Sequence, residues 1–164
     1  MSAPLQKLSF RTYLAMLENS PGTRLFNSLY VRSADGGEVR DVFNNGEFSC
    51  AGFVTSVLTL SGLLESPSAT VDTAERRLRE LGWEEVAPNA AEKGDIVFWA
   101  PAQYPDGSGH RHMGFALSAS EAVSTDSIEK QVMRHPISRS EEREGKRLLL
   151  IERVLRAPAA LRAE

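Results

Sequence analysis

Residues 46–60 read GEFSCAGFVTSVLTL, a short polar turn followed by an apolar run. The spacing of the apolar residues predicts a helix whose first turn contains Cys50. Apolar side chains cover most of the circumference of this helix, which predicts a central, buried element. These side chains are Phe53, Val54, Val57, Leu58, Leu60 and Leu64.

Cys50 is the only cysteine of the chain. The backbone N–H groups at a helix N-terminus stabilise a thiolate, so this position is expected to lower the pKa of the thiol. Further along, His112 precedes the apolar run Met113 to Leu117. A lone cysteine and a histidine far apart in sequence are a candidate nucleophile and base. The pattern therefore predicts thiol-based acyl transfer.

The rest of the chain divides into a helical first half and a strand-rich second half. Helices are expected over about 10–18, with Ser9 as the cap, and over about 72–81, and residues 25–31 read as a short strand or a helical turn. After Gly82 the apolar period changes to two, and strands are expected over 96–99, 113–117, 121–124, 131–135 and 148–154. Helices followed by strands predict an α+β fold with helices packed on one face of an antiparallel sheet.

Length and composition restrict the class of protein. The 164 residues fit one compact domain, and a net charge of −3 gives no sign of a nucleic-acid surface. A single cysteine excludes an intrachain disulfide. No stretch approaches the ~18 apolar residues of a membrane span, and residues 1–10 do not resemble a signal peptide. We therefore expect a cytoplasmic protein with no membrane partner, unless a dedicated secretion or lysis system exports it.

Three segments resemble the NlpC/P60 and CHAP group of bacterial papain-like cysteine peptidases and amidases. They are 48–54 (FSCAGFV), 91–99 (AEKGDIVFW) and 112–117 (HMGFAL), and the weaker match 121–124 (EAVS) follows them. Their order and spacing carry the resemblance, which spans roughly residues 45 to 125. It implies a papain-like core over 46–155, preceded by a helical segment over 1–45 in the same domain. Residues 156–164 are expected to be a disordered tail.

The resemblance implies that Cys50 is the nucleophile and that His112 is the base. Backbone N–H groups at the helix start would form an oxyanion hole, and Ser49 and Trp99 are candidates for that hole or for a substrate wall. The implied activity is hydrolysis of an amide bond, most often in peptidoglycan stem peptides. The partner would be a peptide or a peptidoglycan fragment, and no metal or organic cofactor is implied.

The chain departs from the pattern of this group at two places. Ser49 stands where the group usually has aspartate. The group also uses a third polar residue to orient the imidazole, and counting along the hairpin puts Ser124 at that place. Asp126 or His135 could serve instead.

Two other interpretations come from different classes. A catalytically inactive domain could bind a peptide or protein in the same cleft. Alternatively, His110 and His112, which alternate on one strand, could form a zinc site with Cys50 and His135.

Overall fold

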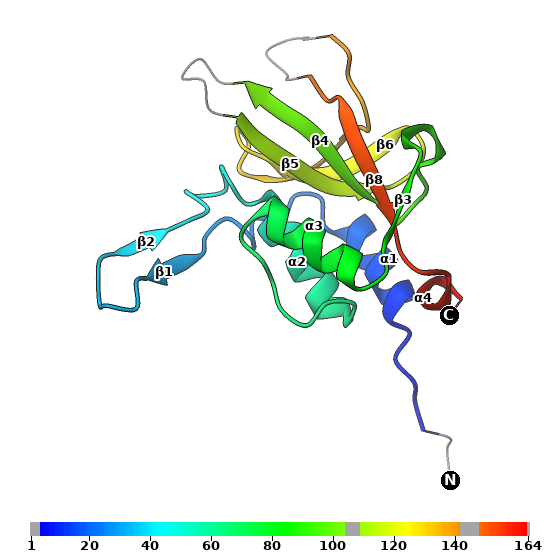
Figure 1. Ribbon diagram of the computed structural model, residues 1–164, viewed down its shortest axis with the longest axis horizontal. Coiled ribbons are helices and arrows are strands. Elements are labelled where there is room, and N and C mark those ends of the chain that lie inside the picture. The colour runs from blue at the N-terminus through cyan, green and yellow to red at the C-terminus, as the bar shows by residue number, and fades with distance from the viewer. Residues whose placement is uncertain (1–3, 104–108, 142–147, 164) are drawn as a thin grey trace.

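The computed structural model describes residues 4–103, 109–141 and 148–163. A six-stranded sheet with the order β3-β8-β4-β5-β6-β7 forms the frame, and every neighbouring pair in it is antiparallel. Its strands are β3 (Glu84–Val86), β4 (Ile96–Gln103), β5 (Gly109–Ala116), β6 (Glu121–Asp126), β7 (Gln131–Pro136) and β8 (Ile151–Arg156). Helices α1 (Ser9–Asn19), α2 (Cys50–Ser61) and α3 (Val71–Glu80) gather on one side of this sheet (Figure 1). The predicted α+β class is therefore confirmed.

Helix α2 is the central helix, as its sequence predicts. It packs against α1, α3 and β5, and the side chains of Phe53, Val54 and Leu58 are fully buried. Leu60, which the sequence placed among the buried positions, is exposed instead. The apolar surface of α2 is broad but not continuous, and its second half leaves one side open to solvent.

The sheet buries apolar side chains on both faces. On β4, Ile96 and Phe98 belong to the large core under the helices, whereas Val97 and Trp99 belong to a smaller cluster on the opposite face. This alternation follows from the period of two along a strand. The opposite face carries the polar groups described below.

Several local expectations need correction. Leu8, not Ser9, is the N-cap of α1, and no side chain caps that terminus. The tail is not disordered as expected, because Ala157 is buried and residues Ala159–Arg162 form helix α4. The partly buried Leu161 packs against the main core, so the tail gains apolar contacts that hold it in place.

The sequence analysis also missed two short strands and a 3-10 turn, and of the segment 25–31, expected as a short strand or a helical turn, only the last two residues lie in a strand. The strands β1 (Tyr30–Arg32) and β2 (Val39–Asp41) form a separate hairpin that projects from the body (Figure 1), and β3 forms an edge of the main sheet. The 3-10 turn is Pro88–Ala90. Within the described residues, none of the helices has both the length and the apolarity that crossing a membrane requires.

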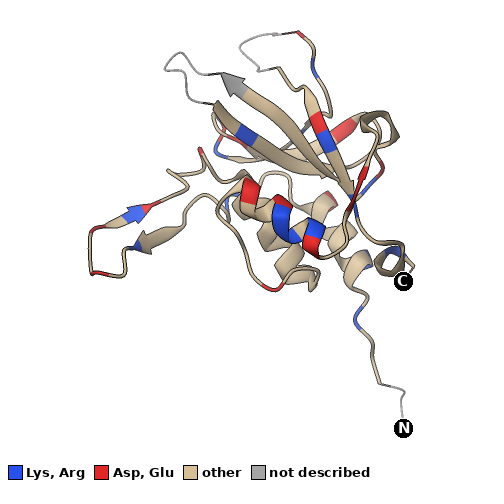
Figure 2. Ribbon diagram, in the orientation of Figure 1, with Lys and Arg blue, Asp and Glu red and all other residues tan. Residues whose placement is uncertain are grey.

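Helix α3 is anchored to the sheet by charges as well as by apolar contacts. Acidic and basic residues both lie along it (Figure 2). Glu75 of this helix is buried and accepts hydrogen bonds from Arg111 of β5 at 2.8 Å and from Arg153 of β8 at 2.5 Å. Burial alone would raise the pKa of Glu75, but the two guanidinium groups outweigh it and lower the pKa below its ordinary value. This ion pair network ties α3 to the residue that directly precedes His112.

Candidate active site

The sulfur of Cys50 lies against the backbone of β5, on either side of His112. The thiol approaches the carbonyl oxygen of Arg111 at 3.9 Å, and the backbone N–H of Met113 hydrogen-bonds to the sulfur. The hydrogen-bonded ladder between β5 and β6 pairs only Phe115 with Val123 and Ala116 with Ala122. The sulfur contacts β5 at Arg111, beyond the last of these pairs.

The thiol of Cys50 is buried, and this reverses the pKa shift expected from its position in the helix. Burial is the largest influence and raises the pKa, while the N–H groups of Met113, Ala51 and Cys50 lower it by a smaller amount. The net direction is upward. The resting group is thus a thiol, not a thiolate, and a nucleophilic reaction needs a base to remove its proton.

Four neighbouring strands each contribute one residue to a row of polar and aromatic side chains. These residues are Trp99 of β4, His112 of β5, Ser124 of β6 and His135 of β7. Trp99 pairs with His112, and His135 pairs with Ala122, two residues from Ser124. The period of two then places all four side chains on the same face of the sheet.

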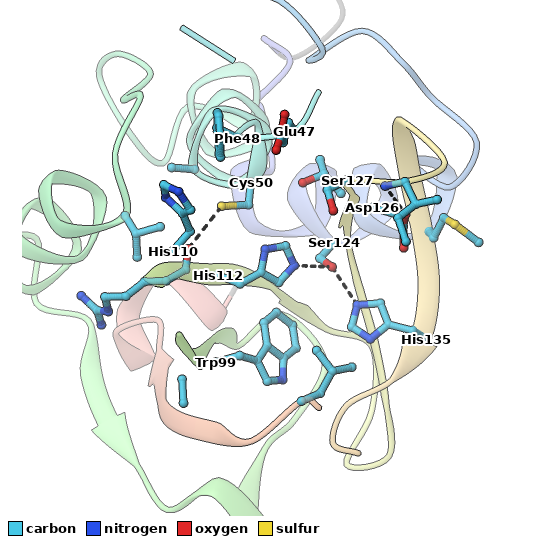
Figure 3. A pocket seen from close by; sticks show the side chains of 18 of the residues that line it. Glu47, Phe48, Cys50, Trp99, His110, His112, Ser124, Asp126, Ser127 and His135 are labelled. Carbon is cyan, nitrogen blue, oxygen red and sulfur yellow. Dashed lines mark hydrogen bonds between the residues drawn. The ribbon is translucent and has the colours of Figure 1, made fainter. Parts of the chain in front are cut away.

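The two imidazoles of this row are joined by the hydroxyl of Ser124 (Figure 3). His112 Nε2 lies 2.9 Å from Ser124 Oγ, and the same oxygen lies 2.8 Å from His135 Nε2. His135 Nδ1 continues the series to the carbonyl oxygen of Pro136, at 2.9 Å. Ser124 and His135 therefore lie in series behind His112.

Trp99 forms the floor below both histidines. Its indole stacks on the ring of His112, with centroids 5.3 Å apart, and contacts the ring of His135 at 5.4 Å. The indole N–H donates to the carbonyl oxygen of Ile137 at 2.7 Å, which fixes the ring. Trp99 is only 1% exposed, so it supports the histidines more than it presents a wall to a substrate.

These groups line a pocket of about 630 Å³, a volume within the range of small-molecule sites. Cys50, His112, Ser124 and His135 all contribute to its lining. At another part of the pocket, the ring of Phe48 lies against that of His110, with centroids 4.7 Å apart. The cleft thus combines a candidate nucleophile, a candidate base and an aromatic pair.

Two other candidates have local structural roles. The side chain of Ser49 is buried and donates to the carbonyl oxygen of Gly46 at 3.1 Å, so it stabilises the turn before α2. Asp126 accepts the backbone N–H groups of Ile128 and Glu129 at 2.8 Å each, which closes the turn between β6 and β7. Asp126 lines the pocket, but the side chain that hydrogen-bonds to His112 is that of Ser124.

The structure gives no support to the zinc alternative. Within residues 4–103, 109–141 and 148–163, no group of three or more histidine, cysteine, aspartate or glutamate side chains is placed to hold a metal ion. His110 faces Phe48, whereas His112 and His135 meet at Ser124.

The sequence analysis treated Ser124 and His135 as alternatives and missed that their side chains are hydrogen-bonded to each other. The signal was present in the hairpin: with Asp126 paired to Gln131, counting back places His135 opposite Ala122 and on the face of Ser124. The position of His135 opposite Ala122 could not be predicted, because the sequence did not give the length of the turn between β6 and β7. The link from Arg111 to Glu75 also had no signal, because the charged face of α3 reads as a solvated surface.

Comparison with known proteins adds no relative to this picture: no family model and no curated protein matches the sequence.

Proposed function

We propose that the chain is a cysteine-dependent amide-bond hydrolase with a papain-like arrangement of its site. One observation carries the proposal: the only thiol of the chain lies at the start of a buried helix and against the backbone that flanks a pocket-lining histidine. The helix-on-antiparallel-sheet frame and the three sequence segments quoted above support the papain-like assignment. By the same resemblance, the substrate class is a peptidoglycan stem peptide or a related small peptide.

The reaction follows from the resting state of the site. His112 takes the proton of the Cys50 thiol while the sulfur attacks the substrate carbonyl carbon, so an S–C bond forms as the S–H bond breaks. The N–H groups at the start of α2 stabilise the oxyanion of the tetrahedral intermediate. The C–N bond then breaks, the amine leaves with the proton from His112, and water hydrolyses the thioester. An acceptor amine in place of water would give transacylation.

Acylation by p-nitrophenyl acetate tests the proposal without knowledge of the natural substrate. We expect a burst of p-nitrophenol and an acetyl group on Cys50 by mass spectrometry. His112→Ala is expected to slow the burst by about 100-fold or more, the range for loss of a general base. Cys50→Ala should abolish the burst.

His110→Ala provides a matched control, because His110 lines the same pocket but has no part in the proposed proton transfer. It should leave the rate of the burst within a factor of about two. Equal rates for the parent protein and His112→Ala would refute the assignment of the base. Hydrolysis of peptidoglycan stem peptides by the parent protein, lost in Cys50→Ala, would then test the substrate class.

A second candidate is a domain that binds peptides without catalysis. The observation that favours it is the raised pKa of the Cys50 thiol, since an enzyme of this kind often holds a reactive thiolate. Binding of stem peptides to Cys50→Ala, together with no burst in the parent protein, would support this candidate over the hydrolase.

A further inference from the structure

The carbonyl oxygen of Pro136 fixes the direction of the hydrogen bonds that end at His112. A carbonyl oxygen can only accept, so Nδ1 of His135 donates to it and carries a proton. In the neutral imidazole, Nε2 of His135 is then the acceptor. The hydroxyl of Ser124, at 2.8 Å, must donate to that nitrogen.

The same order of donors and acceptors determines which ring nitrogen of His112 carries a proton. Because the only proton of the Ser124 hydroxyl points to His135, its oxygen accepts the bond from His112 Nε2 at 2.9 Å. Nε2 of His112 therefore carries a proton. In a neutral His112, Nδ1 holds the lone pair.

We propose that His135 is a positioning residue that acts on His112 through the Ser124 hydroxyl and makes Nδ1 the nitrogen that accepts the Cys50 proton. This inference rests on the proposed function of Cys50 and His112 and adds a fourth member to their site. It explains how serine, which is short, can orient an imidazole: the hydroxyl has its own acceptor behind it. During acylation the thiol proton moves to Nδ1 of His112, and Nε2–H continues to donate to Ser124.

The surroundings of His135 keep it in the neutral form that this order requires. Burial is the largest influence and lowers the pKa of His135, and Arg139 lowers it further. The carbonyl of Pro136 and the carboxylates of Asp126 and Glu121 act in the opposite direction, and the net direction is downward. From β4 it faces the uncharged ring of Trp99, and through Ser124 it meets His112. His135 is therefore neutral, and its Nε2 accepts the hydrogen bond from the Ser124 hydroxyl.

The experiment is side-chain ¹⁵N NMR of the full chain, which contains only three histidines. In the parent protein at a pH where His112 is neutral, we expect a protonated Nε2 and an unprotonated Nδ1 on this residue. His135→Phe keeps an aromatic ring beside Trp99 but removes the acceptor, and Ser124→Ala removes the bridge. Both should move His112 towards a mixture of tautomers. His135→Gln, whose carbonyl oxygen can accept from Ser124, should restore the parent pattern.

The rate of the p-nitrophenyl acetate burst provides the second readout. Each of His135→Phe and Ser124→Ala should slow it by about fivefold, the factor that matches one hydrogen bond of ordinary net strength. Because the two residues act in series, the double variant should be no slower than Ser124→Ala alone. Ser118→Ala, on an exposed turn that does not line the pocket, should change neither the tautomer of His112 nor the rate.

The outcomes separate this inference from the proposed function. An Nδ1–H tautomer in the parent protein, an unchanged tautomer in His135→Phe, or additive losses in the double variant would each overturn the inference. If the burst still depends on His112 in that case, the proposed function stands and only the inference about His135 fails. Conversely, the expected tautomer series in a protein with no burst would refute the hydrolase and leave the order of the hydrogen bonds intact.

Discussion

Gly114 is the residue that lets the strands of the site approach one another. A Cβ atom at this position would lie 2.6 Å from the carbonyl oxygen of Val123, 2.7 Å from Cβ of Ser124 and 3.0 Å from the ring of Trp99. Two of these neighbours belong to the site itself. The glycine two residues after His112 is therefore required by the close contact between β5 and β6.

Gly114→Ala is expected to destabilise the fold by about 1–3 kcal/mol, the usual cost of overpacking a buried position. It should also slow the acylation burst, because Ser124 has to move away from His112. Urea unfolding and the burst assay measure the two effects. Gly37→Ala is the control: its added methyl group would meet the Ser33 hydroxyl at 2.3 Å, but that side chain is exposed and can rotate away, so a smaller loss than for Gly114→Ala is expected. A Gly114→Ala protein with parent stability would contradict the close-contact argument.

At the level of elements, the network around Glu75 connects α3 to two strands of the sheet. The carboxylate bonds Arg111 of β5 and Arg153 of β8, while Arg79 of the same helix contacts it at 3.3 Å. Arg111 also pairs with Asp72 at 2.7 Å. Loss of this carboxylate leaves several guanidinium groups close together, so the helix and both strands are affected.

Glu75→Gln should lower the free energy of unfolding at pH 7 by about 1–2 kcal/mol, a value reduced from that of a fully buried pair because the arginines reach solvent. Since the folded-state pKa of Glu75 is depressed, its contribution is complete above the unfolded value of about 4.5 and disappears as pH falls through the folded pKa. Urea unfolding at pH 7 and at pH 3 should therefore show a smaller difference between variant and parent at the lower pH.

Glu80→Gln on the same helix is the matched control, because its partner Arg76 is exposed and the pair is solvated. We expect a change in stability of less than about 0.5 kcal/mol for this variant. A Glu75→Gln effect as small as that of the control would show that the network contributes no net stability.

The elements that periodicity defines were predictable, and those that depend on distant contacts were not. Helix α2 and the starts of β4, β6 and β7 lie where the apolar pattern places them. The short strand β3 has only three residues, two of them exposed, so its pairing with β8 leaves no periodic signal. At the candidate site, the sequence predicted that Cys50, His112 and Ser124 lie near one another, and all three line one pocket. The contact of the sulfur with β5 could not be predicted, because it depends on where the ladder between β5 and β6 ends.

At the scale of the whole molecule, α1 joins the helical layer to the sheet through a buried tyrosine. The hydroxyl of Tyr13 donates to the carbonyl oxygen of Gly94 at 2.8 Å, and its ring packs edge-on against Trp83 and Phe115. Burial raises the pKa of Tyr13 well above its ordinary value, and Asp95 raises it further. Cys50 also has a raised pKa through burial, so both groups favour their neutral forms in the folded state.

Stability is therefore expected to fall at alkaline pH. A group with a raised folded-state pKa contributes fully below its unfolded pKa, and the contribution disappears as pH rises towards the folded value. For Cys50 this decline begins near pH 9, and for Tyr13 near pH 10. Tyr13→Phe should lose about 1 kcal/mol at pH 7 through its missing hydrogen bond, and the difference from the parent should narrow above pH 10.

Urea unfolding between pH 7 and pH 10.5, a range chosen to pass about half a unit beyond the ordinary tyrosine pKa, measures this narrowing. Tyr30→Phe is the control, because Tyr30 lies exposed on β1. Its stability should follow that of the parent protein across the whole range. A constant difference between Tyr13→Phe and the parent would show that ionisation of Tyr13 is not linked to unfolding.

The contact between the sulfur of Cys50 and β5 links the candidate nucleophile to the backbone of the strand that carries His112. In the proposed reaction, an acyl group on the sulfur would replace the thiol proton that approaches the carbonyl oxygen of Arg111, and it would crowd the backbone N–H of Met113. Each turnover would therefore disturb and restore the backbone contacts of β5. We expect the amide hydrogen of Met113 to exchange with solvent faster in the acylated protein than in the resting protein.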